Sequence, residues 1–265
     1  MSDSMAAPCM PTSQLFETAS EHALAGSVVA RASLTERERT EMYELFQTYF
    51  AGTTQAQFET DLAEKETAIL LRAGASAAIQ GFSTLMRIET RVGGRDVVAF
   101  FSGDTIVARE YWGETELSKL WSRAVFAEAD GICEKRPDTA VYWFLICSGY
   151  KTWRFLPVFF RDFYPHPDHP TPECTQKILD ELATRKFGAQ YQKETGVVKL
   201  RSATPLREGV ANVTQERLRD PRIAFFVRMN PGYQEGDELA CLAEISRSNL
   251  TRAGERALKL CEGKS

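Results

Sequence analysis

The segment that links the run Arg95–Val107 to the run Glu114–Phe126 carries the residue types best suited to hold a ligand. Ile106 and Val107 end an extended, β-type run, and the short polar turn Trp112–Thr115 precedes residues with helical apolar spacing. A strand that turns directly into a helix presents free backbone N–H groups and the positive end of the helix dipole. Several folds hold a phosphate-bearing cofactor in this way. The sequence therefore predicts an anion site at this turn.

Other motifs of catalytic or metal-binding type are weak. His166, His169 and Cys174 are residue types that bind zinc. However, four prolines in the nine residues 164–172 stiffen this segment, no fourth ligand lies nearby, and His22 stands alone. No Gly-x-Ser-x-Gly elbow, glycine-rich dinucleotide fingerprint or Walker loop occurs. We therefore expect exposed loop histidines and no metal centre.

Composition excludes several classes of function. The 265 residues carry a net charge of −4, and the basic residues are scattered, so we do not expect nucleic acid as a partner. No apolar run approaches the roughly 18 to 20 residues of a membrane span, and the first residues lack the pattern of a signal peptide. The six cysteines form no Cys-x-x-Cys pair, which is typical of reduced thiols. These features predict a cytoplasmic protein with no membrane span.

The first half of the chain predicts two helices followed by strands. Thr35 with Glu38, and Thr54 with Gln57, are spaced as capping boxes that begin helices. The run Thr67–Arg72 predicts the first strand. Two longer β-type runs, 79–92 and 95–107, flank Gly93-Gly94, which suits a tight hairpin turn.

The rest of the chain continues the mixture of helices and strands. The run Ala140–Cys147 lacks alternation, as expected for a strand covered on both faces. Tyr150–Phe163 is rich in aromatic residues, and Pro157 predicts a kink or a break in it. Residues 202–220 give no clear pattern. Further expected elements are a helix at Cys174–Arg185, strands at Val197–Leu200 and Ile223–Arg228, and a last helix from about Asn249 to Leu260.

The order of these elements resembles that of GNAT-type acyltransferases. The strand 95–107 and the following residues 108–117 resemble the fourth strand and pyrophosphate loop of that family, which reads Arg/Gln-x-x-Gly-x-Gly/Ala. Gly113 is retained, whereas Trp112 replaces the basic residue, and Thr115 and Leu117 replace small residues. The resemblance covers about residues 34–164 and rests on element order more than on motif letters. It implies that Ile106, Val107 and the turn Trp112-Gly113-Glu114-Thr115 bind an acyl thioester, either acyl-CoA or an acyl carrier protein.

The resemblance also implies roles for titratable residues. In such enzymes a tyrosine on the helix after the fifth strand protonates the leaving thiolate, which makes Tyr150 the first candidate and Cys147 the second. A general base for the acceptor amine would be Glu89 or Asp104. Each has a simpler interpretation: Tyr150 as a half-buried aromatic residue, Cys147 as a core thiol, Asp104 as part of a bulge or turn, and Glu89 as a solvated charge.

We therefore expect an α/β (α+β) protein with a GNAT-like central mixed sheet flanked by helices, and with an additional C-terminal strand and helices. Its expected divisions are a flexible arm (1–33), a GNAT-like core (34–164) and a C-terminal extension (165–265). The expected function is transfer of an acyl group to a small-molecule amine. Two alternatives stay open: a non-catalytic ligand-binding or interaction protein of the same fold, and an acyl-homoserine-lactone or N-acyl-amino-acid synthase-like enzyme.

Overall fold

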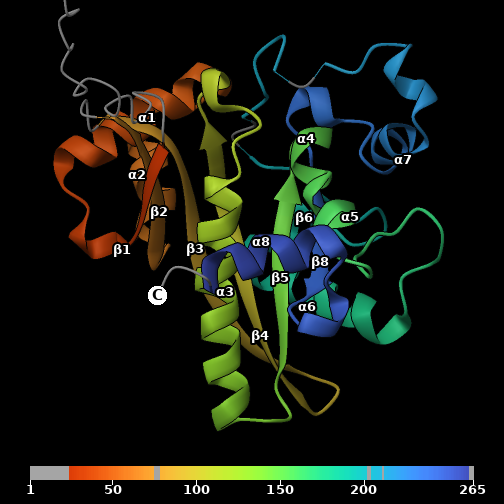
Figure 1. Ribbon diagram of the computed structural model, residues 1–265. Helices are drawn as coiled ribbons and strands as arrows, with labels where there is room; N and C mark the ends of the chain where they lie inside the picture. Colours follow the sequence, from red (N-terminus) through yellow and green to blue (C-terminus); the bar gives the residue numbers. More distant parts are fainter. Residues whose placement is uncertain (1–23, 75–77, 202–203, 211, 263–265) are drawn as a thin grey trace, which may run out of the picture.

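The computed structural model describes residues 24–74, 78–201, 204–210 and 212–262. They form one mixed sheet in the order β1-β2-β3-β4-β5-β8-β7-β6, with helices on both faces (Figure 1). The α/β class and the mixed sheet are therefore as expected. The strands are β1 Leu24–Ala30, β2 Thr67–Ala73, β3 Ile79–Val92, β4 Arg95–Val107, β5 Ala140–Cys147, β6 Tyr191–Gln192, β7 Val197–Val198 and β8 Glu238–Glu244.

The long hairpin of β3 and β4 forms the centre of the fold, as predicted. Gly93 and Gly94 make its turn with φ values of +59° and +84°, a region that glycine enters without steric cost. Near the other end of the hairpin the register shifts between Ser83 and Leu85, which leaves a β-bulge at residues 103–104. This bulge is one of the two interpretations given for Asp104 from the sequence.

Strand β5 lies between β4 and β8 and is buried along most of its length. It pairs parallel with β4, and that pairing ends at Ser102 and Leu145, although β4 continues to Val107. On its other side β5 pairs antiparallel with β8. Seven of the eight β5 residues are buried, which confirms the strand covered on both faces. The element order implied by the GNAT resemblance, with helices before the first long hairpin and a helical crossover from β4 to β5, is present.

Local signals account for the first helices. Thr35 accepts a hydrogen bond from the Glu38 N–H while Glu38 accepts from Thr35, and Thr54 and Gln57 repeat this capping box. The helices are α1 Glu36–Tyr49, α2 Gln55–Ala63, α3 Glu116–Lys135, α4 Tyr150–Trp153, α5 Phe155–Phe159, α6 Glu173–Phe187, α7 Pro221–Met229 and α8 Arg252–Glu262.

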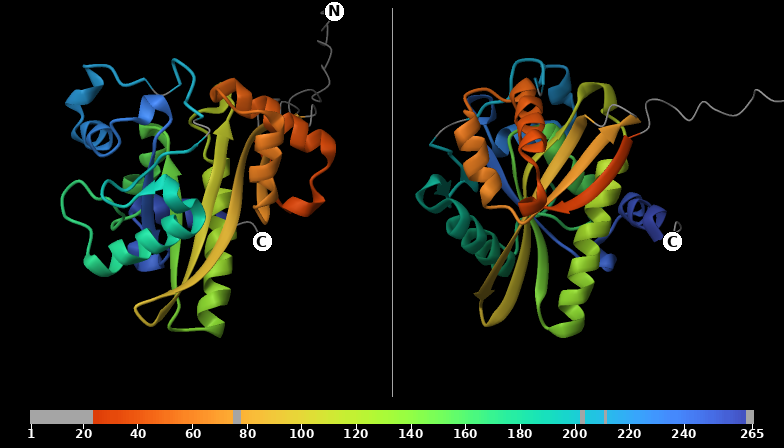
Figure 2. Two further views of the ribbon diagram at one scale, coloured as in Figure 1. Left: turned by 180° about the vertical axis from the view of Figure 1, so that it is seen from behind. Right: turned by 90° about the vertical axis from the view of Figure 1, so that its left-hand side faces the viewer.

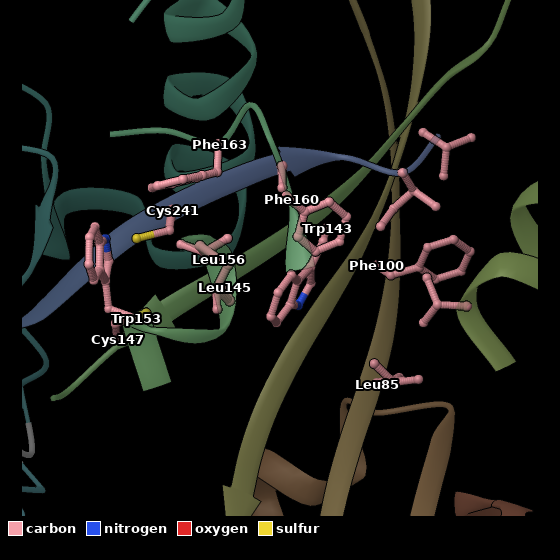
Figure 3. Close-up of a cluster of buried hydrophobic side chains, with 14 of the residues drawn as sticks. Leu85, Phe100, Trp143, Leu145, Cys147, Trp153, Leu156, Phe160, Phe163 and Cys241 are labelled. Atoms are coloured by element: carbon pink, nitrogen blue, oxygen red, sulfur yellow. The ribbon is translucent and has the colours of Figure 1, made fainter. Parts of the chain in front are cut away.

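Helices cover the two faces of the sheet unequally. Helices α3 and α8 lie on one face, and α1, α2 and α6 lie on the other (Figure 2). The core on the α3 face is rich in aromatic residues: Trp143 from β5, Trp153 from α4, and Phe160 and Phe163 from the following segment (Figure 3). The predicted aromatic segment therefore packs into the core, and two short helices, α4 and α5, replace one long helix there.

Some elements differ from the sequence prediction. The segment Ile223–Arg228 is helical rather than extended, because Asp220 caps the Arg222 N–H and Pro221 occupies the first helical position. Strand β8 was not predicted. The predicted last helix begins three residues later, at Arg252, after a 3-10 turn at residues 247–249. The helix predicted from Glu114 begins at Glu116, and the strand predicted at 197–200 is limited to Val197–Val198.

The single sheet contains strands from all three expected divisions of the chain. Strand β1 comes from residues assigned to the N-terminal arm, and it pairs with β2 along its whole length. Strands β6, β7 and β8 come from the expected C-terminal extension and complete the same sheet. The first 23 residues, including His22, lie outside the described part of the chain. Within the described part no helix is both long and apolar enough to cross a bilayer.

Candidate functional site

The turn between β4 and α3 has the form that the sequence predicts. After Val107 a single 3-10 turn covers Arg109–Tyr111, Gly113 adopts a φ of +112°, and α3 begins after Thr115. The Thr115 side chain makes no capping hydrogen bond to α3. The first turn of this 20-residue helix therefore lacks a side-chain cap, and its dipole end faces the predicted ligand turn.

The predicted cofactor residues in this turn have different environments. Ile106 is buried beneath α1 and α2, so its side chain belongs to the core. The carbonyl of Val107 accepts a hydrogen bond of 2.8 Å from the Trp112 indole. Trp112 itself is 40% exposed, and Glu114 donates its backbone N–H to Tyr111. The indole is therefore fixed at the surface beside the end of β4.

Two cations lie over the Trp112 ring, and three more arginines lie near the neighbouring Tyr150. The Lys151 ammonium lies 3.5 Å from the centre of the Trp112 ring, and the Arg109 guanidinium lies 5.0 Å from it. Burial, and then the positive charges of Arg217 and Arg109, lower the pKa of Lys151. We call Arg109, Lys151, Arg154, Arg217 and Arg222 the basic cluster.

No member of the basic cluster has a carboxylate within ion-pair distance among the described residues. Helices α4 and α7 carry two of its members, Lys151 and Arg222, and lie side by side above the end of β5 (Figure 1). Crowded cations without counter-ions repel each other and attract an anion. The basic cluster therefore reinforces the anion site expected at the turn.

Tyr150 lies within the basic cluster, at the first position of α4. Its pKa is raised by burial and by the charge of Asp220, against the opposite effect of Arg154, Arg222 and Arg217. Its ring packs 6.3 Å from that of Trp153, and its hydroxyl has no hydrogen-bond partner within the part of the chain that the structure describes. A free phenol next to an anion site could donate a proton to a leaving group there.

Asp104 lies at the β-bulge of β4, on the face covered by α2 and α6. Burial and the charge of Asp61 raise its pKa to about 7, while Lys65 and Lys186 act in the opposite direction. The residue is nevertheless partly exposed to solvent. A carboxylate with a pKa near neutrality can accept a proton and release it at physiological pH. The structure therefore keeps Asp104 as a candidate general base.

Glu238, which the sequence analysis did not identify, lies at the same end of the sheet as Asp104, with β5 between their two strands. It is the first residue of β8, beside the end of β5, and is only 8% exposed. Burial and the charge of Asp104 raise its pKa to about 8, against the effect of a hydrogen bond with Ser148. We call Asp104 and Glu238 the acidic pair. No sequence motif marks Glu238, because β8 and β4 are remote from each other in the chain.

The structure places Glu89 far from the other candidates. It pairs with Val98 in the hairpin, six strand residues from Asp104, a separation of about 20 Å at ~3.3 Å per residue. Burial raises its pKa, but hydrogen bonds and charges from Arg136 and Arg87 outweigh that effect and lower it. Glu89 lines an open pocket of about 570 Å³ at the far end of the sheet. It is not brought together with Tyr150 or Asp104.

Cys147 lies inside the core rather than in an accessible site. Its side chain has no exposed surface, and it belongs to the cluster in which Cys241 also lies (Figure 3). Burial and a hydrogen bond with Cys241 raise its pKa well above the usual value. A buried thiol of this kind fits the simpler interpretation of Cys147 as a core residue.

The residues His166 and His169 stack on each other at a ring distance of 3.9 Å with an angle of 8°. The ring nitrogen of His166 accepts a hydrogen bond from the Asp168 backbone. Within the described segments no group of three or more His, Cys, Asp or Glu side chains is arranged to hold a metal ion. The histidines therefore contribute to the local structure of the proline-rich connector.

No protein-family model and no curated protein matches this chain. Among solved structures, it is similar to a probable N-acyltransferase from Enterococcus faecalis V583, with 16% identity, a TM-score of 0.38, and coverage of 52% of this chain and 33% of that one. It is also similar to a GNAT-family N-acetyltransferase from Escherichia coli in complex with CoA, with 16% identity, a TM-score of 0.33, and coverage of 50% and 68%. A third is glucosamine-6-phosphate N-acetyltransferase from Arabidopsis thaliana, with 14% identity, a TM-score of 0.33, and coverage of 49% and 88%. The chain spans about a third of the length of the first of these proteins.

Proposed function

We propose that this protein is an N-acyltransferase that moves an acyl group from an acyl thioester to a small-molecule amine. The observation that carries the proposal is that one end of the sheet holds two separate groups of charged residues, one basic and one acidic. The basic cluster follows the ends of β4 and β5, and the acidic pair lies at the same end of β4 and β8. A donor with phosphate groups and an acceptor with a positive charge would complement these two sites.

The donor would bind through its phosphates to the basic cluster and to the uncapped start of α3. Beyond Ser102 the backbone of β4 is no longer paired with β5. Its free N–H groups could polarise the thioester carbonyl, as an oxyanion hole does. Both acyl-CoA and the phosphopantetheine arm of an acyl carrier protein carry the required phosphate and thioester.

The proposed reaction is the attack of the acceptor amine on the thioester carbonyl. The acceptor ammonium gives one proton to ionised Asp104, and its nitrogen then attacks the carbonyl carbon. A C–N bond forms and the C–S bond breaks, while the second nitrogen proton passes to solvent water and Asp104 later releases its own proton to solvent. Tyr150 donates its phenol proton to the departing thiolate and regains one from water. The products are an amide and a free thiol.

A non-catalytic binding protein of the same fold is the second candidate. The observation that favours it is the filled interior below the point where β4 and β5 separate. There the indoles of Trp121 and Trp143 both donate hydrogen bonds to the Ser102 hydroxyl, at 3.0 and 2.8 Å. In that case the turn at Trp112 would bind an anionic ligand or partner without any transfer. The synthase-like alternative, a long-chain acyl enzyme, would require the same donor site.

Calorimetric titration with CoA, acetyl-CoA and longer acyl-CoAs tests the donor site directly. We expect binding in the wild type, and a loss of about 10-fold to 100-fold in affinity for the Lys151→Ala variant, since a charge-assisted hydrogen bond contributes roughly 1.5 to 3 kcal/mol. Lys177→Ala is the matched control, because Lys177 is exposed and paired with Glu173 on α6.

Release of free thiol on mixing acyl-CoA with an amine collection then tests for transfer. Binding followed by thiol release supports the acyltransferase, and binding without release supports the non-catalytic candidate. Thiol release from an acylated carrier protein alone would identify the carrier as the donor. Absence of binding to every thioester, free or carrier-bound, would overturn the proposal.

A further inference from the structure

Exposed aromatic side chains lie beside the basic cluster. In the described part of the chain three large apolar side chains are exposed, and two of them are aromatic: Trp112, 40% exposed, and Phe155, 41% exposed. Trp112 belongs to the turn after β4, and Phe155 is the first residue of α5. The third, Val28, lies on the edge strand β1. Aromatic residues are enriched in protein interfaces, so the surface around Trp112 and Phe155 is a candidate for binding a partner.

Helical geometry connects these aromatic residues through Lys151. Arg154, between α4 and α5, keeps helical backbone angles, with φ at −59° and ψ at −23°. Lys151 and Phe155 are therefore one helical turn apart and lie on the same side. The Lys151 ammonium lies 3.5 Å from the centre of the Trp112 ring, and the Phe155 ring stacks on that of Phe159 at 5.8 Å. We call Trp112, Lys151, Phe155 and Phe159 the aromatic ridge.

The positive charge around the ridge comes from α4, α7 and the segments beside them rather than from the turn. Residues 109–116 contain one arginine and three glutamates, whereas residues 150–159 contain two basic residues and no acidic one. Residues 214–228 contain four arginines, one glutamate and one aspartate, and this aspartate, Asp220, caps α7. Helix α7 packs against α4, and the 3-10 turn Arg217–Arg219 packs against α7 (Figure 1). The cations are therefore spread over several packed elements beyond the turn.

This distribution of charge suits a thioester carried by an acidic protein better than free CoA. CoA has a pyrophosphate and a ribose phosphate, and phosphates bound at the turn would lie close to Glu110 and Glu114 and be repelled by them. The phosphopantetheine arm of a carrier protein has a single phosphodiester. The other negative charges lie on the carrier itself, where they would face the cations beyond the turn. An exposed aromatic residue within a basic surface is a suitable anchor for such a partner.

We propose that the aromatic ridge and the basic cluster bind an acidic acyl carrier protein, which brings the acyl group to the site on its phosphopantetheine arm. The role of the carried group rests on the proposed acyltransferase function, whereas the docking surface rests on the ridge and the cluster themselves. Phe155 is the apolar anchor, and Arg154 and the cations of α7 face carboxylates of the carrier. The arm passes the turn at Trp112 and reaches the part of β4 that is not paired with β5.

Surface plasmon resonance with the full chain measures this docking. The probes are a bacterial acyl carrier protein of fatty-acid synthesis, in its apo, holo and octanoyl forms, and free octanoyl-CoA. The apo form lacks the arm, so it separates contact between the two proteins from binding of the arm. We expect all three carrier forms to bind, the octanoyl form most tightly and more tightly than octanoyl-CoA. The affinity for the apo form should fall about 10-fold or more between about 50 and 300 mM NaCl, because salt screens the attraction.

Two variants with matched controls test the two parts of the surface. Phe155→Ser removes the apolar anchor and Arg154→Glu reverses a charge that faces the partner, so each should weaken carrier binding about 10-fold or more. Phe155→Ser should change the affinity for free octanoyl-CoA less than that for the carrier. Val28→Ser, at the similarly exposed apolar residue of β1, and Lys177→Glu, on α6 at the face opposite α3, should match the wild type. Circular dichroism verifies that each variant is folded.

The outcomes separate this inference from the proposed function. Carrier binding that depends on Phe155 and Arg154, without thiol release in the presence of any amine, would keep the docking surface and overturn the acyltransferase. Absence of binding to every carrier form would overturn the docking surface, and thiol release from free octanoyl-CoA would then keep the acyltransferase. Equal carrier binding by all four variants would also overturn the docking surface. Tighter binding to vesicles of equal parts phosphatidylcholine and phosphatidylglycerol than to the carrier would overturn it in favour of an anionic lipid surface.

Discussion

The protonation of Glu238 should control the stability of the protein. Its ordinary pKa is 4.5, and in the fold it rises to about 8 because the carboxyl is buried beside Asp104. Below pH 4.5 both the folded and unfolded states hold the proton. Between these two values only the folded state does, so stability falls as the pH rises, and the contribution is lost above about pH 8.

The size of the effect follows from the pKa change. At about 1.4 kcal/mol per pKa unit, the rise from 4.5 to about 8 corresponds to roughly 4 to 5 kcal/mol between pH 4 and pH 9. Local relaxation and water entry reduce this value, so it is an upper bound. The Glu238→Gln variant carries no charge at any pH. It should equal the wild type within about 1 kcal/mol at pH 4.5 and exceed it by several kcal/mol at pH 9.

Urea unfolding followed by tryptophan fluorescence at pH 4.5, 7 and 9 provides the measurement. The comparison is the difference in free energy of unfolding between Glu238→Gln and the wild type, with Glu244→Gln as the control on the same strand. Glu244 is exposed, so its variant should follow the wild type. If the Glu238→Gln and wild-type curves run parallel across this pH range, folding does not raise the pKa of Glu238, and the reasoning is refuted.

Three other substitutions test separate features. Ser102→Ala removes the shared acceptor of the Trp121 and Trp143 indoles, so the urea midpoint should fall by the equivalent of about 1 to 3 kcal/mol; an unchanged midpoint would mean that water replaces the hydroxyl. Tyr150→Phe should lower kcat about 100-fold with donor affinity unchanged, and a normal kcat would remove Tyr150 from the proton route. Gly113→Val forces a β-branched residue to a φ of +112°, so it should cost about 1 to 3 kcal/mol and weaken CoA binding; equal CoA affinity would place the phosphates elsewhere.

The parts of the fold that the sequence predicts correctly are those set by neighbouring residues. Capping at Thr35 and Thr54 needs partners only three positions away, and Gly93-Gly94 determines its own turn. Strand β8 depends instead on pairing with β5, which no local pattern records. The misassigned helix α7 contains an apolar run that suits either structure, and the cap at Asp220 with Pro221 decides the outcome.

The candidate site divides in the same way. The turn at Trp112 was predictable because strand, turn and helix are consecutive in the chain. Asp104 was identified by its position in a strand, but its altered pKa arises from α2, α6 and β8. Glu238 and the cations of α7 enter the site only through the three-dimensional arrangement. Glu89 satisfied the same positional criterion as Asp104, yet the length of the hairpin keeps it away.

The position of β8 also has a consequence for synthesis of the protein. Strand β8 begins at Glu238, 91 residues after β5 ends at Cys147, yet it pairs directly with β5. During synthesis on the ribosome, the edge of β5 that later pairs with β8 is therefore unpaired, and it carries no charged residue. Closing so large a loop is slow. Exposed apolar edges of this kind recruit other chains. Nascent or truncated chains that stop before Glu238 should accordingly depend on chaperones and aggregate when these are limiting.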